Sequence, residues 1–251
     1  MTQRIAIAGK GGTGKTTFAA LLIQLLIPKG TVLAIDADPS TNLHMALDLP
    51  LGPAVGDIRE GMLLLVKKGQ FSPGMAKSDY LELKVQEALV ESQGVDLLIM
   101  GRPEGPGCYC AANEILRNTI ERLSKNYDFV VVDCEAGMEH LSRHTAGNVD
   151  SLILLTDLSQ RSLVAARRMK ELVAELKTKV GRVGVVVNRL GNGLPPVLEK
   201  GLAEAGLELW GVLPDDEELK ALEAQGKAVV KLPASSPLRQ SVSQISHHLG
   251  I

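Results

Sequence analysis

The chain has 251 residues, of which 45% are apolar, and its formal net charge is −2. This length and composition allow one large α/β domain with a substantial core, and we expect residues 1–251 to form a single domain. The chain has no excess of positive charge to attract a polyanion, which argues against nucleic acid or an anionic membrane surface as a partner.

The sequence also indicates a compartment. No stretch approaches about 18 uncharged apolar residues, so no transmembrane helix is expected. The apolar run after Arg4 ends in a glycine-rich loop, which is unlike a signal peptide. Three cysteines, an odd number, do not suggest a disulfide framework. We therefore expect a cytoplasmic protein.

Short runs rich in Val, Ile and Leu recur along the chain and predict strands. They cover Arg4–Ala8, Thr31–Asp36, Val95–Met100, Phe129–Asp133, Ser151–Thr156, Arg182–Asn188 and Glu208–Leu213. Helix-compatible segments lie between most of them, at Thr16–Ile27, Ala112–Lys125, Ser162–Lys177, Pro195–Ala205 and Asp215–Gln225. The runs are nearly continuous rather than alternating, as in strands buried on both faces. This order predicts an α/β fold, with a doubly wound, mainly parallel sheet of seven or eight strands and helices on both faces.

Residues 43–93 interrupt this alternation. The stretch is compatible with helix, is punctuated by Gly52-Pro53 and Pro73-Gly74, and carries no chemical motif. We expect a helical insertion that caps the core or, alternatively, presents a surface to a partner.

The first predicted strand leads into a glycine-rich loop. Gly9 to Thr16 match the phosphate-loop pattern G-x-x-x-x-G-K-[ST], whose backbone N–H groups turn inward around an anion. Lys15 would reach the terminal phosphates and Thr16 would ligate Mg²⁺. The expected nucleotide-binding residues here are Gly11, Gly12, Thr13, Gly14, Lys15, Thr16 and Thr17. A second lysine, Lys10, points away from its own phosphates and is better placed to serve a nucleotide held by a second subunit.

Polar clusters follow the other predicted strands, at the sheet edge where α/β proteins bind ligands. Asp133 ends the fourth strand and is the expected acidic partner of Mg²⁺. Asp38 follows the second strand, where a carboxylate can position an attacking water, and Asp36 would support that loop. Each aspartate could instead be a turn residue or a helix N-cap. Asp38, Lys10 and Lys15 are the predicted catalytic residues.

Four segments together resemble the MinD/ParA branch of P-loop ATPases, which includes the nitrogenase iron protein. They are residues 10–17, 36–39, 133–137 and 187–189. The resemblance covers nearly the whole chain, and it implies a P-loop NTPase fold and Mg²⁺-dependent hydrolysis of ATP to ADP and phosphate. It also implies a homodimer that sandwiches two ATP molecules, with Lys10 reaching into the opposite subunit and Asp38 in switch I. Asn188, Pro214 and Asp215 match the adenine-binding positions, although Asn188 could equally be a strand-end cap.

Cys108 and Cys110 surround a tyrosine after the Gly/Pro-rich segment 102–107, which predicts an extended start for the pair. Residues i and i+2 of an extended chain project to the same side, so two thiolates could share one soft metal ion. A twofold axis nearby would supply two more thiolates, giving one ion per dimer. The alternative is two small residues packed under a loop. Cys134, next to Asp133, is expected to face the packing of the sheet.

The Cys-x-Cys motif and residues 136–146 resemble a narrower family, the CooC/AcsF nickel-maturation ATPases. This resemblance implies binding of Ni²⁺ or Zn²⁺ at Cys108 and Cys110, and delivery to a Ni–Fe–S client, carbon monoxide dehydrogenase or acetyl-CoA synthase. His140 and His144 could be extra ligands or surface residues. The nitrogenase iron protein holds its cluster with a second cysteine further along switch II, and the corresponding residues 138–141 contain none. This departure disfavours a bridging 4Fe–4S cluster of that type.

Two other functions stay open at this point, a MinD/ParA-type positioning ATPase and an ATP-dependent iron–sulfur carrier. Membrane-binding members of the positioning class end in a basic amphipathic helix. Here the C-terminal apolar stripe has only Arg239 as a cation on its other face, so we expect it to pack on its own domain. The stripe consists of Leu238, Val242, Ile245 and Leu249.

Overall fold

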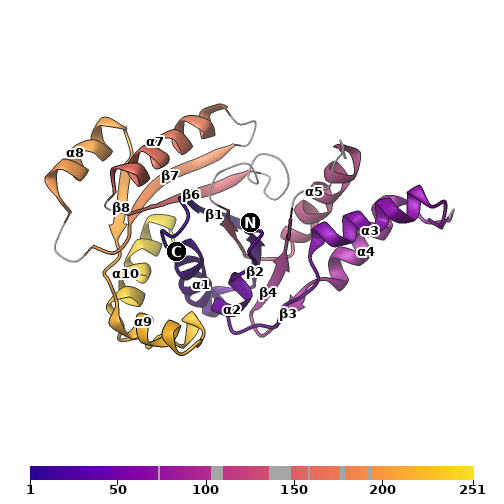
Figure 1. Cartoon of the computed structure of the whole chain (residues 1–251), viewed down its shortest axis with the longest axis horizontal. Coiled ribbons are helices and arrows are strands. Elements are labelled where there is room, and N and C mark those ends of the chain that lie inside the picture. Colours follow the sequence, from indigo (N-terminus) through magenta and orange to yellow (C-terminus); the bar gives the residue numbers. More distant parts are fainter. Residues whose placement is uncertain (73, 103–109, 136–147, 158, 176–178, 191–193) are drawn as a thin grey trace.

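The computed structural model describes residues 1–72, 74–102, 110–135, 148–157, 159–175, 179–190 and 194–251 (Figure 1). Among these residues, one eight-stranded sheet has the order β3-β4-β2-β5-β1-β6-β7-β8. Every neighbouring pair is parallel except β3 and β4. The strands are β1 (Gln3–Gly9), β2 (Val32–Ala37), β3 (Val90–Glu91), β4 (Val95–Ile99), β5 (Phe129–Cys134), β6 (Val149–Thr156), β7 (Val180–Val187) and β8 (Glu208–Val212). The predicted doubly wound, mainly parallel sheet is confirmed.

Helices cover both faces of the sheet, as the continuous apolar strands require. They are α1 (Lys15–Leu26), α2 (Leu43–Ala46), α3 (Val55–Lys67), α4 (Lys77–Glu87), α5 (Cys110–Ser124), α7 (Gln160–Glu175), α8 (Pro196–Glu204), α9 (Glu217–Ala224) and α10 (Pro237–Ser246). Alternate side chains of β1, β2, β4, β5, β6 and β7 enter two different apolar clusters. Ile5 and Ile7 pack with α1 and α10, whereas Ala6 and Ala8 share a cluster with residues of α5, α7 and α8.

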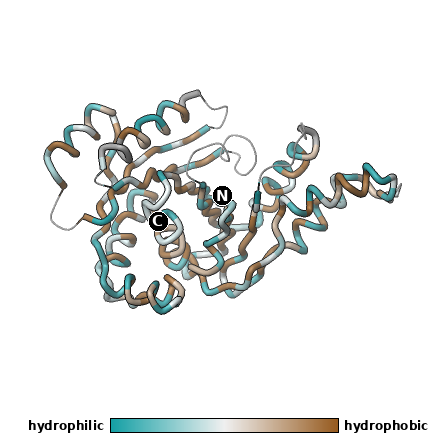
Figure 2. The backbone as a smooth tube through the Cα atoms, viewed as in Figure 1, coloured by the Kyte–Doolittle hydropathy of each residue, from teal (hydrophilic) through white to brown (hydrophobic). Residues whose placement is uncertain are grey.

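Within residues 43–93 the structure places α2, α3, α4 and the short strand β3. The helices α3 and α4 extend away from the sheet beside α5, at the opposite end of the molecule from α8 (Figure 1). Met62 of α3, Leu81 of α4 and Ala112 of α5 form a small apolar cluster of their own. Brown, apolar stretches of the backbone trace accordingly run through the strands and also appear on this helical arm (Figure 2).

The C-terminal apolar stripe packs on the domain, as predicted. Leu238, Val242, Ile245 and Leu249 are all buried, and they belong to the cluster that contains α1. Arg239 donates a hydrogen bond from Nη1 to the carbonyl of Leu232 at 2.9 Å. This face is therefore occupied by the protein's own core. In the described part of the chain, no helix is both long enough and apolar enough to span a membrane.

Candidate functional site: a phosphate loop, a magnesium site and a base pocket

The loop between β1 and α1 has the backbone shape that the glycine pattern predicts. Gly12 and Gly14 have φ values of 80° and 90°, in the left-handed region that favours glycine. A Cβ on Gly14 would lie 2.4 Å from Nδ2 of Asn188, which itself donates to the carbonyl of Thr13 at 2.8 Å. A side chain at Gly14 would therefore displace the Asn188 amide and break its hydrogen bond to the loop.

Hydrogen bonds inside the loop converge on the carbonyl of Lys10. It accepts the Thr13 hydroxyl at 2.8 Å and Nζ of Lys15 at 3.4 Å. Lys15 is only 7% exposed, whereas the Lys10 side chain is exposed. The helix α1 starts at Lys15 without a side-chain cap, so its first-turn N–H groups are available to an anion. Loop, helix start and buried ammonium together form a cradle that can hold phosphate groups.

The chemistry beside the loop fits Mg²⁺. The Thr16 hydroxyl donates to Oδ2 of Asp133 at 2.6 Å, and Asp133 is only 1% exposed. Its other oxygen, Oδ1, is buried and accepts no hydrogen bond from any described residue. An oxygen that is buried without a partner is costly, and a hard cation with oxygen ligands would satisfy it. Thr16 and Asp133 are therefore the residues that could hold Mg²⁺.

Asp36 organises the neighbouring loop. It lies opposite Asp133 in the parallel pair of β2 and β5 and is fully buried. Its Oδ1 accepts the N–H of Asp38 at 3.1 Å, and its Oδ2 accepts the N–H of Leu43 at 2.9 Å. Burial raises the pKa of Asp36, and these two hydrogen bonds oppose the rise. Asp36 thus supports the Asp38 loop, as the sequence predicts.

The Asp38 carboxylate is held on the same side of the sheet. Its Oδ1 accepts the N–H and the hydroxyl of Ser40, at 2.9 and 2.5 Å. The negative charge of Asp38 contributes to a raised pKa at Asp133, which places these two carboxylates within electrostatic reach of each other. The structure therefore brings Asp38, Lys15, Thr16 and Asp133 together at one edge, where hydrolysis of a bound phosphate could be supported.

The environment of Asp133 leads to a prediction about pH. Burial raises its pKa from 3.8 to about 7, against the opposing effects of the Thr16 hydrogen bond and the Lys15 charge. Because the folded pKa is above the unfolded one, the folded state binds more protons between these two values. Protonation of Asp133 therefore contributes fully to the free energy of unfolding below about pH 4. This contribution, up to roughly 4 kcal/mol, is lost as the pH rises to about 7.

Urea unfolding of nucleotide-free, Mg²⁺-free protein from pH 5 to 8 tests this prediction. As the pH rises, the free energy of unfolding should fall more in the wild type than in Asp133→Asn, since the amide does not ionise. Parallel pH profiles of the two proteins would show that Asp133 is not desolvated in the folded state.

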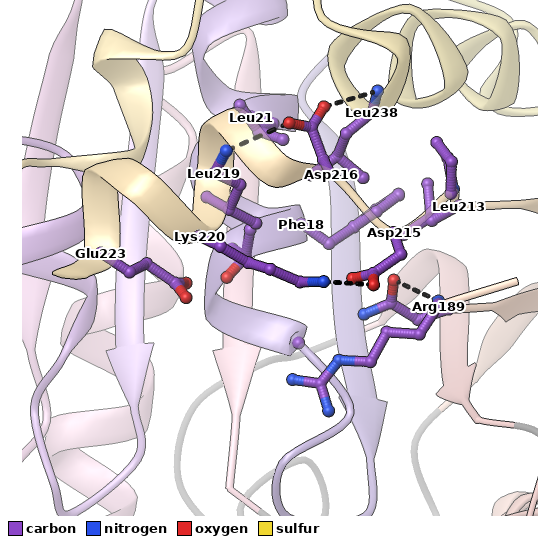
Figure 3. A pocket seen from close by; sticks show the side chains of 14 residues that line it. Phe18, Leu21, Arg189, Leu213, Asp215, Asp216, Leu219, Lys220, Glu223 and Leu238 are labelled. Carbon is purple, nitrogen blue, oxygen red and sulfur yellow. Dashed lines mark hydrogen bonds and ion pairs between the residues drawn. The ribbon is translucent and has the colours of Figure 1, made fainter. Parts of the chain in front are cut away.

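A pocket of about 260 Å³ lies beside the phosphate loop (Figure 3). Its walls come from the start of α1, the end of β7, the segment after β8, and the helices α9 and α10. Asn188, Pro214 and Asp215, the predicted adenine-binding residues, all line it. Phe18 and Leu219 add apolar surface, so a flat base could be buried there while its phosphates extend to the loop.

Two further lining residues, Asp216 and Lys220, were not among the predicted site residues. Asp216 caps α9, and an aspartate directly before a helical pattern is a recognisable capping signal. Lys220 forms ion pairs with Asp215 and Glu217 at the rim. An exposed lysine on a helix carries no comparable sequence signal.

The predicted metal residues are only partly described. Cys110 is the first residue of α5, so it is helical, and the helix starts two residues before the predicted Ala112. The predicted extended start of the pair, at Cys108, is not tested. Cys108, His140 and His144 lie outside the described residues. Within the described ranges, no cluster of three or more His, Cys, Asp or Glu side chains could hold a metal ion.

Cys134 is buried, as predicted, among the apolar residues of the face that contains α5 and α7. Burial raises the pKa of its thiol, and the adjacent Asp133 charge raises it further. A buried thiol of this kind is a poor metal ligand, because the thiolate is the binding form.

The fold and the loop define the class, a nucleotide-binding protein with a phosphate loop at the carboxyl edge of a parallel sheet. A profile of the CobQ/CobB/MinD/ParA nucleotide binding domain matches residues 5–229, and the chain belongs to this family. The protein is therefore an ATPase of the MinD/ParA type, for which ATP with Mg²⁺ is the expected nucleotide complex.

Curated relatives extend over almost the whole chain. An uncharacterized ATP-binding protein of Methanocaldococcus jannaschii is 44% identical over 246 residues, covering 98% of this chain and 97% of that protein. The carbon monoxide dehydrogenase accessory protein CooC of Rhodospirillum rubrum is 30% identical over 237 residues, covering 89% and 88%.

Solved structures show the same fold at low identity. A ParA family ATPase from Chlorobium tepidum has a TM-score of 0.71 at 22% identity, covering 99% of both chains. The septum site-determining protein MinD of Pyrococcus horikoshii, solved with Mg-ADP, has a TM-score of 0.69 at 22% identity, covering 99% of this chain and 96% of that one.

Proposed function

We propose that this ATPase is a homodimeric metallochaperone. In this proposal Cys108 and Cys110 of two subunits bind one nickel ion, and the dimer promotes its insertion into a Ni–Fe–S enzyme, carbon monoxide dehydrogenase or acetyl-CoA synthase. The 30% identity to the accessory protein CooC, over nine-tenths of the chain, supports the proposal. The four-thiolate set also suits a soft ion such as Ni²⁺ or Zn²⁺.

The observation that carries the proposal is where the Cys-x-Cys segment leaves the sheet. β4 pairs with β2, and Ile99, the last residue of β4, lies opposite Asp36. The N–H of Met100 donates to the carbonyl of Asp36 at 2.8 Å. Met100 is thus bound beside the Asp36–Asp38 loop. In this proposal a movement of that loop on ATP hydrolysis is transmitted through Met100 to the chain that continues to Cys108.

In the same proposal the triphosphate occupies the phosphate loop and the adenine base occupies the pocket lined by Asn188, Pro214 and Asp215. Asp38 positions the attacking water, and Lys10 serves the nucleotide of the partner subunit. Binding of ATP closes the dimer and brings the four thiolates together. Hydrolysis reopens the dimer and releases the metal to the client.

Substitution of the cysteines tests the metal site. Cys108→Ser and Cys110→Ser are each expected to abolish tight Ni²⁺ or Zn²⁺ binding, because the shared site needs all four thiolates, while ATP hydrolysis largely persists. Isothermal titration of reduced protein with and without ATP would measure the stoichiometry. We expect one ion per dimer in the wild type, with an affinity that falls at acid pH as protons compete for the thiolates.

Cys134→Ser is the matched control, because it removes a buried thiol that is not part of the Cys-x-Cys motif and should leave metal binding intact. Full metal binding by the Cys108/Cys110 double variant would contradict the proposal. It would favour the alternative function, a positioning ATPase. A brown chromophore in anaerobically purified protein would instead indicate an iron–sulfur carrier.

A further inference from the structure

Asp216 lines the base pocket and lies between the starts of α9 and α10 (Figure 3). It is 6% exposed, and each of its two carboxylate oxygens accepts two hydrogen bonds from the protein. Oδ1 accepts the N–H groups of Glu218 and Leu219, at 2.9 and 3.0 Å. Oδ2 accepts the Ser236 hydroxyl at 2.6 Å and the N–H of Leu238 at 3.4 Å. One side chain therefore caps α9 and also binds the start of α10.

Ser236 completes the connection. It is 0% exposed, and its Oγ accepts the N–H of Arg239 at 3.3 Å, which makes it the N-cap of α10. The same hydroxyl donates to Asp216. Both hydrogen-bonding capacities of this hydroxyl are thus engaged, and the first turns of two helices meet at one carboxylate–hydroxyl pair.

These two helices supply one wall of the pocket. Leu219, Lys220 and Glu223 come from α9, and Leu238 comes from α10. Burial alone would raise the pKa of Asp216, but hydrogen bonds from the Ser236 hydroxyl and three backbone N–H groups outweigh it and lower the pKa. With four donors already bound, the ionised carboxylate has no acceptor position left for a hydrogen bond from the base.

We propose that Asp216 is a positioning residue for nucleotide binding, which acts by holding the starts of α9 and α10 together so that their side chains close on the base. The proposal rests on the placement of the base in this pocket, proposed above. It predicts that Asp216 governs the part of ATP affinity that depends on the base and leaves the part that depends on the phosphates unchanged.

The test compares Mg²⁺–ATP with Mg²⁺–tripolyphosphate, which has phosphates but no base, by isothermal titration. We expect Asp216→Ala to weaken ATP binding about 10- to 30-fold, since α9 loses its cap and the start of α10 loses its hydrogen bonds to this carboxylate. Tripolyphosphate affinity should stay within about twofold, because the phosphate loop is untouched. In steady-state hydrolysis KM should rise by the same factor as the ATP Kd, with kcat retained.

Ser236→Ala and Asp216→Asn distinguish the contribution of the Ser236 hydroxyl from those of the two Asp216 oxygens. Ser236→Ala removes one partner and should weaken ATP binding less than Asp216→Ala. The loss in the double variant should be smaller than the sum of the two single losses, because both substitutions remove the same Asp216–Ser236 hydrogen bond. Asp216→Asn keeps an acceptor for α9 but replaces the other oxygen with a donor, so an intermediate loss is expected. These two variants carry the test if Asp216→Ala does not fold.

Asp128→Ala is the matched control. Asp128 also accepts a backbone N–H and a hydroxyl, both from Thr31, at 2.8 and 3.0 Å. Since Asp128 and Thr31 directly precede β5 and β2, this pair lies at the amino edge of the sheet, away from the pocket. Its loss should lower the urea midpoint while leaving both ligand affinities unchanged.

Three results would overturn the proposal, and they differ in what else they affect. Equal losses of ATP and tripolyphosphate affinity in Asp216→Ala would show that the role of Asp216 is only structural. The proposed placement of the base in the pocket would be unaffected. Unchanged ATP affinity in the Asp216 and Ser236 variants would have the same meaning. Equal affinities of the wild type for ATP and tripolyphosphate would show that the base is not bound in the pocket, so the placement of the base would fail as well.

Discussion

Lys10→Ala is expected to bind ATP almost as tightly as the wild type but to hydrolyse it roughly 10³-fold more slowly. The reason lies in the different positions of the backbone and the side chain of Lys10. Its carbonyl holds Thr13 and Lys15 inside the loop, and alanine keeps that carbonyl. Its side chain is exposed, where a second subunit could use it. The variant should therefore lose only the charge offered to the partner's nucleotide.

Mixing two inactive variants distinguishes action across the dimer from action within one subunit. In a mixed dimer of Lys10→Ala and Asp38→Asn, one of the two sites combines an intact Asp38 with an intact Lys10 from the partner. An equal mixture should recover about one quarter of wild-type turnover, because half of the dimers are mixed and each has one complete site. If Lys10 acts within its own subunit, the mixture should be as inactive as either variant.

Lys15→Ala should lose nucleotide binding itself, by roughly 10²–10³-fold in affinity, because it removes the charge that meets the terminal phosphates. Lys15 is 7% exposed, and its described hydrogen-bond partner is the neutral carbonyl of Lys10. Burying an ammonium costs free energy when the loop is empty, and the attraction of the nearby Asp133 carboxylate offsets only part of that cost. The nucleotide-free variant should accordingly be about as stable as the wild type.

Thermal unfolding with and without Mg²⁺–ATP measures both parts of this prediction. The wild type should gain stability on adding ATP, since the ligand binds only the folded state, and Lys15→Ala should gain almost none. Lys10→Ala is the matched control from the same loop and should keep the shift. A persisting shift in Lys15→Ala would show that the phosphates are held without this lysine.

The strands and the phosphate loop could be predicted because their signals are local. Runs of Val, Ile and Leu mark strands buried on both faces, and the glycines at 12 and 14 supply the left-handed backbone that the loop needs. The strand β3 was missed, since two residues, Val90 and Glu91, are too few to show a pattern. The start of α5 was placed two residues late because the Gly/Pro-rich segment before Cys108 masks the beginning of the helix.

The sequence by itself determined the class of fold, the chemistry of the phosphate loop and the pairing of Thr16 with Asp133. These depend on backbone conformations and strand ends that a few neighbouring residues specify. Only the tertiary structure decided how the pocket beside the phosphate loop is built and that Asp216, which lines it, binds Ser236, twenty residues away in the chain. A buried hydrogen bond between distant segments forms because packing excludes water around both groups, and packing of that kind leaves no periodic trace in the chain.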